Sequence, residues 1–312
     1  MSLIRKPSEL QVQTTIKALL YGQPGIGKTT LALSAPNPVL LDFDGGVHRV
    51  NTQHQVPTLQ VNDYAEFLEV LGNGELNEYR TLVIDTAGKM LDYMSNYLIK
   101  NDPKIGKRDG SLTLQGFGVR KYEFLRILKA ISIMGKHLVF VAHEREEREG
   151  DQKIVRPEIG GSSANDLIKE LDLVGYYYAV GGQRVVSFDP CEKFYGKNTC
   201  NLANEIKVAH ILDASGMPTA PNTLLTEIFK TYQDNLQKRQ QTASEYRALL
   251  ELLDENMDGI TDLESLNEAR NRLASWEQIW DSKIQAGKKL QAKAATLNAK
   301  FNKDTGKYEP AA

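Results

Sequence analysis

The sequence predicts an α/β fold, with a mainly parallel central sheet, an antiparallel hairpin at the edge of that sheet and a C-terminal α-helical extension. Short continuous apolar runs that alternate with helical stretches are typical of parallel strands buried on both faces. Four such runs occupy residues 16–21, 38–42, 81–85 and 137–142. A glycine-rich segment follows the first run, so the chain is expected to pass from a strand through a tight loop into a helix.

Helices and an edge hairpin complete the predicted core. Helical patterns cover residues 31–35, 63–71, 89–100 and 119–134. Apolar runs at 173–180 and 184–188 flank the Gly181-Gly182 pair, which predicts a hairpin with a tight turn. A further strand is expected at 206–212.

The C-terminal part of the chain is predicted to be helical. Strand patterns end near residue 224, and helices are expected at 245–256 and 262–300, separated at Asp258-Gly259. We therefore expect a core at 1–230, a helical extension at 231–301 and a disordered tail at 302–312. An apolar stripe on the second helix either packs against other helices or, if exposed, offers a docking surface for a protein. It contains Leu263, Leu266, Leu273, Trp276, Trp280 and Ile284.

Charge, cysteines and hydropathy set broad limits. The 312-residue chain carries 38 basic and 40 acidic residues, so any basic surface for nucleic acid must be local. Cys191 and Cys200 lack metal-ligand companions, and two reduced thiols are expected, although a disulfide stays open. No apolar run reaches the length of a signal-peptide core or a membrane span, so we expect a cytoplasmic protein without membrane contact.

The glycine-rich segment at 22–30 completes the pattern G-x-x-x-x-G-K-[ST]. A loop of this kind bares successive backbone N–H groups, which bind phosphate oxygens. Lys28 is expected to reach the β- and γ-phosphates of ATP, and the Thr29 hydroxyl to hold Mg²⁺. The predicted nucleotide contacts are Gly22, Gln23, Pro24, Gly25, Ile26, Gly27, Lys28, Thr29 and Thr30.

Three aspartates at predicted strand ends are candidates for the chemistry. Asp85 closes the third apolar run, where a carboxylate orients Mg²⁺ in P-loop enzymes, unless it only caps the following helix. Asp42 and Asp44 follow the second run, at the edge where open parallel sheets carry their ligands. We expect Asp44, beyond the strand in a glycine-rich loop, to polarise the water that attacks the γ-phosphate. Asp42 is the better candidate for a capping acid.

His143 follows the fourth apolar run. A polar side chain at this position can sense the γ-phosphate and pass that state to the next loop. The alternative is an ordinary histidine at a strand end. With an unperturbed pKa of about 6.5, it would be mostly neutral at pH 7 and would donate a hydrogen bond.

Two irregular, charged segments are candidates for contact with nucleic acid, and solvated surface loops are the alternative for both. A patternless loop as long as 145–163 is usually functional in a compact domain, and its cations are Arg145, Arg148, Lys153 and Arg156. The segment 100–110 contains four basic and two acidic residues, and its candidate contacts are Lys104, Lys107 and Arg108. Phe117, Tyr122 and Tyr195 are candidates for base stacking, although aromatic side chains more often belong to the core.

Six short strings, taken together, carry a family resemblance. They are Tyr21-Gly-Gln-Pro-Gly-Ile-Gly-Lys-Thr29, Leu40-Leu-Asp-Phe-Asp-Gly-Gly46, Val83-Ile-Asp-Thr86, Val139-Phe-Val-Ala-His-Glu144, Pro157-Glu-Ile-Gly-Gly161 and Phe194-Tyr-Gly-Lys-Asn198. Their order resembles the RecA-like recombinase core. More narrowly, the chain resembles phage-encoded nucleotide-binding proteins described as minimal RecA-type single-strand annealing ATPases, over roughly residues 14–230.

The resemblance implies a RecA-like fold, ATP and Mg²⁺ as ligands, and rings or filaments with ATP at the subunit junctions. It implies that Asp44 activates water and that His143 senses the γ-phosphate. Recombinases usually have Glu and an amide at these two positions. It also implies that residues near 100–112 and 145–165 contact single-stranded DNA and that Lys197 reaches a neighbour's site. The helical tail after residue 230 has no counterpart in the resemblance.

The expected function is ATP-dependent binding or annealing of single-stranded DNA in phage recombination or replication, within the cytoplasm of the bacterial host. A single-strand-binding protein is a further candidate partner. The leading alternative is a P-loop ATPase that acts on a protein partner through its helical tail, without binding DNA. A small-molecule or nucleotide kinase is disfavoured because no Arg-rich lid is evident, and a GTPase because no Asn-Lys-x-Asp signature occurs.

Overall fold

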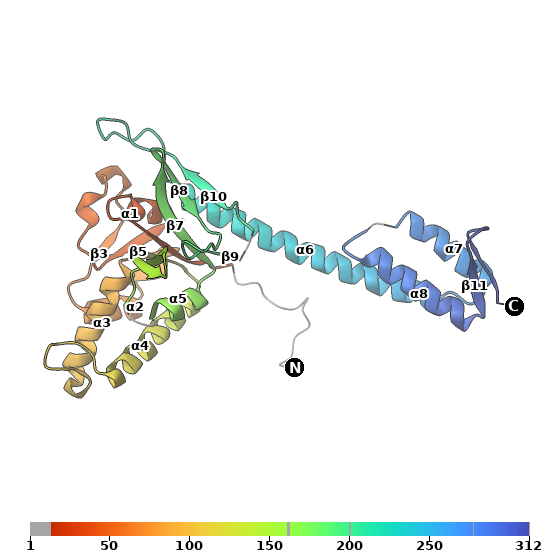
Figure 1. The fold of residues 1–312 in the computed structure, drawn as a ribbon, viewed down its shortest axis with the longest axis horizontal. Helices are drawn as coiled ribbons and strands as arrows, with labels where there is room; N and C mark the ends of the chain where they lie inside the picture. The colour runs from red at the N-terminus through yellow and green to blue at the C-terminus, as the bar shows by residue number, and fades with distance from the viewer. Residues whose placement is uncertain (1–13, 161–162, 200, 277, 312) are drawn as a thin grey trace. The chain divides into compact units, whose positions relative to one another are not determined.

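The computed structural model describes residues 14–160, 163–199, 201–276 and 278–311. Contacts divide the chain into two compact units, one spanning Gln13–Gln233 and the other containing Asp234–Ala312. The first, which we call the core unit, carries the large sheet, and the second, the C-terminal unit, is mainly helical (Figure 1).

Among the described residues, the core unit contains a ten-stranded sheet whose main strand order is β10-β8-β7-β1-β5-β4-β2-β3. The six strands from β7 to β3 in that order run parallel, and β8 and β10 extend the edge in antiparallel pairing. This topology confirms the predicted fold class. The strands are β1 Lys17–Gly22, β2 Pro38–Asp42, β3 Thr58–Gln60, β4 Thr81–Asp85, β5 His137–Glu149, β6 Gln152–Pro157, β7 Leu173–Val180, β8 Gln183–Ser187, β9 Lys197–Asn198 and β10 Glu205–Val208.

Helices cover both faces of the sheet (Figure 1). One face packs into a single apolar cluster with α2 Tyr64–Asn73, α3 Ala87–Asn101, α4 Leu114–Ile133 and α5 Ser163–Glu170. On the other face lie α1 Lys28–Ala32 and the first turns of α6 Leu224–Asp258, where the Leu225 N–H donates to the Ser34 hydroxyl. The sheet is therefore buried on both faces, as its continuous apolar strands require.

Side-chain caps fix where the helices of the core unit begin. Asp63 accepts a hydrogen bond from the Ala65 N–H at the start of α2, and Thr86 accepts one from the Lys89 N–H at the start of α3. Each cap satisfies a backbone donor that has no partner within its helix. The second cap matters for function, because it fixes α3 directly after the last residue of β4.

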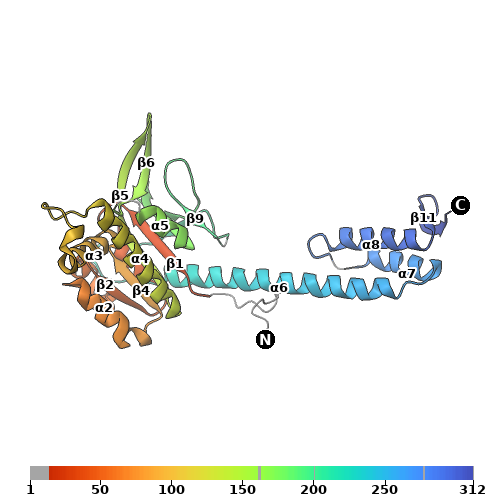
Figure 2. The ribbon, with the colours of Figure 1, turned by 90° about the horizontal axis from the view of Figure 1, so that it is seen from below.

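The segment at 145–163 is largely not the loop that its sequence predicts. Strand β5 continues past its apolar part to Glu149, turns at Gly150 and pairs in antiparallel fashion with β6. Figure 2 shows this β5–β6 hairpin extending beyond the neighbouring strands. The pattern escaped prediction because both faces of the hairpin are largely polar, and cross-strand pairs of opposite charge hold it instead of an apolar core.

The C-terminal unit differs from the prediction at three points. The helix expected at 245–256 is the end of the longer α6, which begins at Leu224. The expected long second helix is two helices, α7 Leu263–Ala274 and α8 Ser282–Thr296. The expected disordered tail contains most of an antiparallel hairpin, formed by β11 Ala299–Asn302 and β12 Lys307–Pro310. This hairpin is ordered because Tyr308 is buried in the apolar cluster of the unit and its N–H donates to the Asn267 side chain.

The apolar stripe predicted on the second helix is divided by the break between α7 and α8. Leu266 is buried, and Leu263, Leu273 and Trp276 pack around it. Trp280 and Ile284 are 58% and 59% exposed. In the described part of the chain, no helix has both the length and the apolar character needed to cross a membrane.

Candidate functional site

The glycine-rich loop connects β1 to α1 at the carboxyl end of the parallel strands. Gly22 packs so closely against β7 that a Cβ atom there would lie 2.0 Å from the carbonyl oxygen of Tyr177. Gly25 and Gly27 have φ values of 79° and 100°, a left-handed conformation that favours glycine. The three glycines therefore shape this loop in the way that its phosphate-binding motif requires.

The Lys28 amine lies inside the loop. It donates hydrogen bonds to the carbonyl oxygens of Gly22 and Gln23, at 2.9 and 2.7 Å. Burial lowers the pKa of Lys28, and the negative charges of Asp85 and two other carboxylates oppose that shift. A phosphate chain in the loop would supply the charged acceptor that these neutral carbonyls do not.

Thr29 and Asp85, the two predicted metal ligands, lie in contact. The Thr29 hydroxyl donates to Oδ2 of Asp85 over 2.6 Å. Burial raises the pKa of Asp85 to about 6, and the hydrogen bond from Thr29 opposes this rise. A hydroxyl and a carboxylate fit Mg²⁺, which prefers oxygen ligands and keeps waters or phosphate oxygens in its other positions. No cluster of three or more His, Cys, Asp or Glu side chains in the described residues forms a metal cage, so this pair is the candidate site.

Asp42 and Asp44 have different environments. The Asp42 carboxylate is buried and accepts hydrogen bonds from the backbone N–H groups of Asp44, Gly46 and Val47, so it caps the loop after β2. The Asp44 carboxylate instead forms an ion pair with Arg49, at 3.1 Å on the protein surface. An exposed pair of this kind contributes about 0–1 kcal/mol, so Asp44 can exchange Arg49 for another partner at little cost.

His143 lies beside the start of the P-loop, because the register of β1 with β5 pairs it with Gly22. Its Nδ1 atom is buried and has no hydrogen-bond partner in the part of the chain that the structure describes. Burial lowers the pKa of His143, and the charge of Lys28 lowers it further. The imidazole is therefore neutral at pH 7 and has a ring nitrogen available to a ligand.

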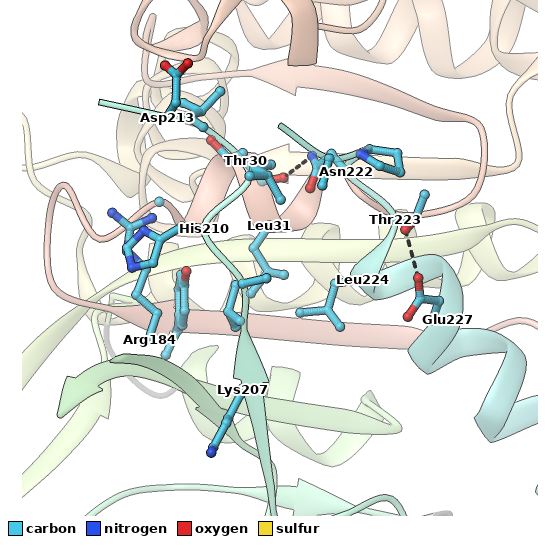
Figure 3. Close-up of a pocket in the computed structure, with 18 residues that line it drawn as sticks. Thr30, Leu31, Arg184, Lys207, His210, Asp213, Asn222, Thr223, Leu224 and Glu227 are labelled. Carbon is cyan, nitrogen blue, oxygen red and sulfur yellow. Dashed lines mark hydrogen bonds between the residues drawn. The ribbon is translucent and has the colours of Figure 1, made fainter. Parts of the chain in front are cut away.

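A pocket of about 650 Å³ adjoins the P-loop at Thr30 (Figure 3). Its walls come from α1, β7, β8 and the chain between Lys207 and Glu227. Asn222 ties the last of these walls to α1, since its side chain donates to the Thr30 carbonyl oxygen over 2.7 Å. Ligand pockets commonly measure roughly 300–1,000 Å³, so a nucleoside attached to phosphates in the loop fits this space.

Apart from Gly27 and Thr30, sequence reasoning missed the residues of this pocket, and it missed one carboxylate. Tyr177 and Arg184 reach the P-loop only because β7 pairs with β1, a contact that no local motif announces. Glu144 follows His143 directly. Burial raises the pKa of Tyr176 and the charge of Glu144 raises it further, and the same charge opposes the lowering of the Lys28 pKa by burial. The sequence signal that could have identified Glu144 was its position directly after His143, the predicted γ-phosphate sensor.

The cations predicted to contact DNA have two different environments. On the β5–β6 hairpin, Arg145 pairs with Glu147, Lys153 with Glu146, and Arg156 with both Glu147 and Glu149. The exposed Arg148 belongs to none of the ion pairs found among the described residues.

The segment between α3 and α4 is different. Lys104, Lys107 and Arg108 are exposed there, and none of them takes part in an ion pair within the described chain. The positive charges of these three side chains are therefore left for a partner.

Lys197, the cation predicted to reach a neighbour's site, is engaged within its own chain. Its amine donates to the carbonyl oxygens of Ile168 and Lys169, both at 3.1 Å. These carbonyls belong to the last turn of α5, so Lys197 caps that helix. A role at a subunit junction stays a prediction.

Fold and site together define a P-loop ATPase domain. The P-loop follows β1, the metal-binding carboxylate ends β4, and β5 lies between these two strands with the polar His143 at the same edge. The chain belongs to the AAA domain family, because the model of that family matches residues 14–200, more than half of the chain.

Comparison with individual proteins adds little. No curated protein matches the sequence. Among solved structures, the chain is similar to the flagellar accessory protein FlaH from Methanocaldococcus jannaschii, with 8% identity and a TM-score of 0.36 over 62% of this chain and 84% of that one.

Proposed function

We propose that this protein is an ATPase that binds single-stranded DNA, with a role in phage recombination or replication, and that it hydrolyses ATP to ADP and phosphate. The observation that supports the nucleotide part best is the contact between Thr29 and Asp85 beside the Lys28 amine. Lys28 and Thr29 begin α1 and Asp85 ends β4, and together these groups match what a Mg²⁺-bound triphosphate needs.

Each residue has a distinct part in this proposal. Thr29 and Asp85 would hold Mg²⁺, which would neutralise charge on the phosphates, and Lys28 would turn from its backbone carbonyls to the β- and γ-phosphates. Asp44, released from Arg49, accepts a hydrogen bond from the attacking water and orients it. His143, neutral at pH 7, donates a hydrogen bond to the γ-phosphate.

A chain of contacts leads from His143 to α4. The Glu158 N–H donates to the His143 carbonyl oxygen at 2.7 Å. Two residues later, the Gly160 carbonyl accepts a hydrogen bond from the buried Arg120 of α4, at 3.1 Å. A movement of His143 on hydrolysis would therefore shift the segment after β6 and, through Arg120, helix α4.

The first turns of α4 and the segment before it form the proposed DNA-binding surface. It combines Lys104, Lys107 and Arg108 with exposed apolar side chains, since Leu114, Phe117 and Tyr122 are 90%, 43% and 74% exposed. Unpaired cations bind the phosphate backbone, and exposed aromatic rings stack with bases. We place the contact here and not on the β5–β6 hairpin, because most of the hairpin's cations are already paired with glutamates.

Two triple variants with equal loss of charge test this placement. One replaces Lys104, Lys107 and Arg108 with Ala, and the other replaces Arg145, Lys153 and Arg156 with Ala. The first is expected to weaken binding of single-stranded DNA by about 10- to 100-fold at low salt. It should also reduce the log–log salt slope by about 2, at roughly 0.7 for each lost phosphate contact. The measurement is fluorescence anisotropy of a labelled oligonucleotide at several salt concentrations, with ATP and Mg²⁺ present.

The hairpin variant is expected to change the affinity less than about threefold. A larger loss in the hairpin variant than in the first variant would move the surface to the β5–β6 hairpin. Wild-type protein that binds no oligonucleotide under any of these conditions would remove the DNA part of the proposal and leave the nucleotide site intact.

A second candidate function follows from the C-terminal unit. Trp280, Ile284 and Leu252 are each at least half exposed there, which is typical of a surface that binds another protein. In that case the chain would be a P-loop ATPase acting on a protein partner. ATP hydrolysis that does not respond to single-stranded DNA, in a chain that does not bind DNA, would favour this candidate.

A further inference from the structure

Arg184 lies beside the P-loop, although it does not belong to the sequence motif of that loop. Its Nη1 atom is 3.5 Å from the position that a Cβ atom on Gly27 would occupy. It lines the pocket that adjoins Thr30, and Figure 3 shows its side chain on the same side of that pocket as His210. A guanidinium at this distance from Gly27 is within reach of phosphates that the loop amides bind.

Two features show that Arg184 is held in place but not neutralised. It lies beside the hydroxyl of the buried Tyr177, since both groups lie next to Gly27. Burial raises the pKa of Tyr177, and the nearby Arg184 opposes this rise. None of the ion pairs found among the described residues includes Arg184. Its only specific partner there is a neutral hydroxyl, so its positive charge is available to a ligand.

The backbone around Arg184 is fixed relative to the loop. Tyr177 of β7 pairs with Gly22 of β1, and Arg184 pairs with Ala179 across the tight turn at Gly181-Gly182. A rigid sheet therefore carries the guanidinium to the P-loop, and Tyr177 fixes its orientation. Such preorganisation reduces the entropy that a flexible arginine would lose on binding an anion.

We propose that Arg184 is a second phosphate-binding cation of the nucleotide site, acting beside Lys28 on the phosphate chain of a nucleoside di- or triphosphate. This inference rests on the proposed nucleotide binding and adds a residue from the antiparallel edge of the sheet. Arg184 lines the pocket beside Gly27, whereas Lys28 lies inside the loop. Tyr177 is a positioning residue that acts through Arg184.

The test separates phosphate contact from contact with the nucleoside. Affinities of the wild type and of Arg184→Ala are measured by calorimetry for ATP and ADP with Mg²⁺, for inorganic pyrophosphate, and for adenosine by competition. Because Arg184→Ala removes a charged hydrogen bond, we expect it to lower the affinity for ATP, ADP and pyrophosphate by about 10- to 100-fold. The affinity for adenosine should change less than twofold. Arg184→Lys should recover part of the loss, and Tyr177→Phe should show a smaller loss with the same selectivity.

Lys129→Ala is the matched control, because it removes one exposed positive charge from α4 in the same unit. It should bind every ligand like the wild type. Unchanged affinity for ATP, ADP and pyrophosphate in Arg184→Ala would overturn the inference, and so would an equal loss for adenosine. If Arg184→Ala does not fold, Arg184→Gln takes its place, and unchanged affinity for the three phosphate ligands in Arg184→Gln would overturn the inference. Wild-type protein that binds none of the ligands would instead remove the proposed function itself.

Discussion

The nucleotide site and the β5–β6 hairpin both gather charged side chains within the core unit, but they neutralise charge in different ways. At the site, the partners of Lys28 are two backbone carbonyls and the hydrogen-bond donor to Asp85 is a hydroxyl. On the hairpin, Arg156 pairs with two glutamates and stacks on the Tyr195 ring at 4.4 Å. Buried charges without ion pairs are unfavourable until a ligand neutralises them, whereas the hairpin's charges already balance. The comparison indicates that the first region is completed by a ligand and that the second is complete by itself.

Lys28→Ala gives the largest expected effect. The variant should lose ATP affinity by more than about 100-fold, because the loop then lacks its central cation. It should still fold, since burial of the Lys28 charge is a cost that alanine does not carry. Calorimetric titration with ATP and Mg²⁺ measures the affinity, and thermal unfolding without ligand checks the fold.

Lys153→Ala is the control from the hairpin, since it also removes one lysine. It should bind ATP like the wild type. If Lys28→Ala kept ATP-dependent DNA binding at full strength, the nucleotide loop would not govern the DNA-binding surface, and the proposed mechanism would be wrong.

Asp85→Asn tests the second buried charge through the pH dependence of stability. Burial raises the pKa of Asp85 to about 6 in the folded chain, above the value of about 3.9 in an unfolded one. The folded state therefore binds this proton more tightly, and the wild type loses stability as the pH rises from about 4 to about 6. Asparagine removes that loss, so the variant should be more stable than the wild type by about 1–3 kcal/mol at pH 7 and nearly equal to it at pH 4.

Urea unfolding at both pH values measures this difference, and Mg²⁺ titration with ATP should show weaker binding in the variant. Asp42→Asn is the matched control. Its carboxylate accepts from three backbone N–H groups, so the amide should lower stability at pH 7. Equal destabilisation by both substitutions would mean that Asp85, like Asp42, is a structural cap and no metal ligand.

Much of the fold could be predicted because its parallel strands are continuous apolar runs. The bounds of β2, β4 and β7 agree with the predicted runs at 38–42, 81–85 and 173–180. Strand β3, Thr58–Gln60, was missed because a run of three residues at the sheet edge is too short to show an apolar pattern. The C-terminal hairpin β11–β12 was missed because its sequence is polar and its order comes from docking on the unit's own helices.

The residues of the site fall into two groups: some could be predicted from a local motif, and others reach the site only through strand pairing. Lys28, Thr29 and the P-loop glycines lie within one motif, and Asp85 lies at the end of an apolar strand, so residue order alone placed them. Arg184 and Tyr177 lie far along the chain, and only the pairing of β7 with β1 brings them to the loop. A motif records contacts within a segment, whereas sheet register sets contacts between segments.

The smallest expected effects are on the hairpin. Lys153 and Glu146 form an exposed pair, so Lys153→Ala should change the free energy of unfolding by less than about 0.5 kcal/mol. Arg156 is 13% exposed and stacks on Tyr195, so Arg156→Ala should cost about 1–2 kcal/mol. Urea unfolding of the two single variants measures this order. If both were as stable as the wild type but bound single-stranded DNA tenfold more weakly, the hairpin's charges would serve a ligand after all, and the contrast between the two regions would fail.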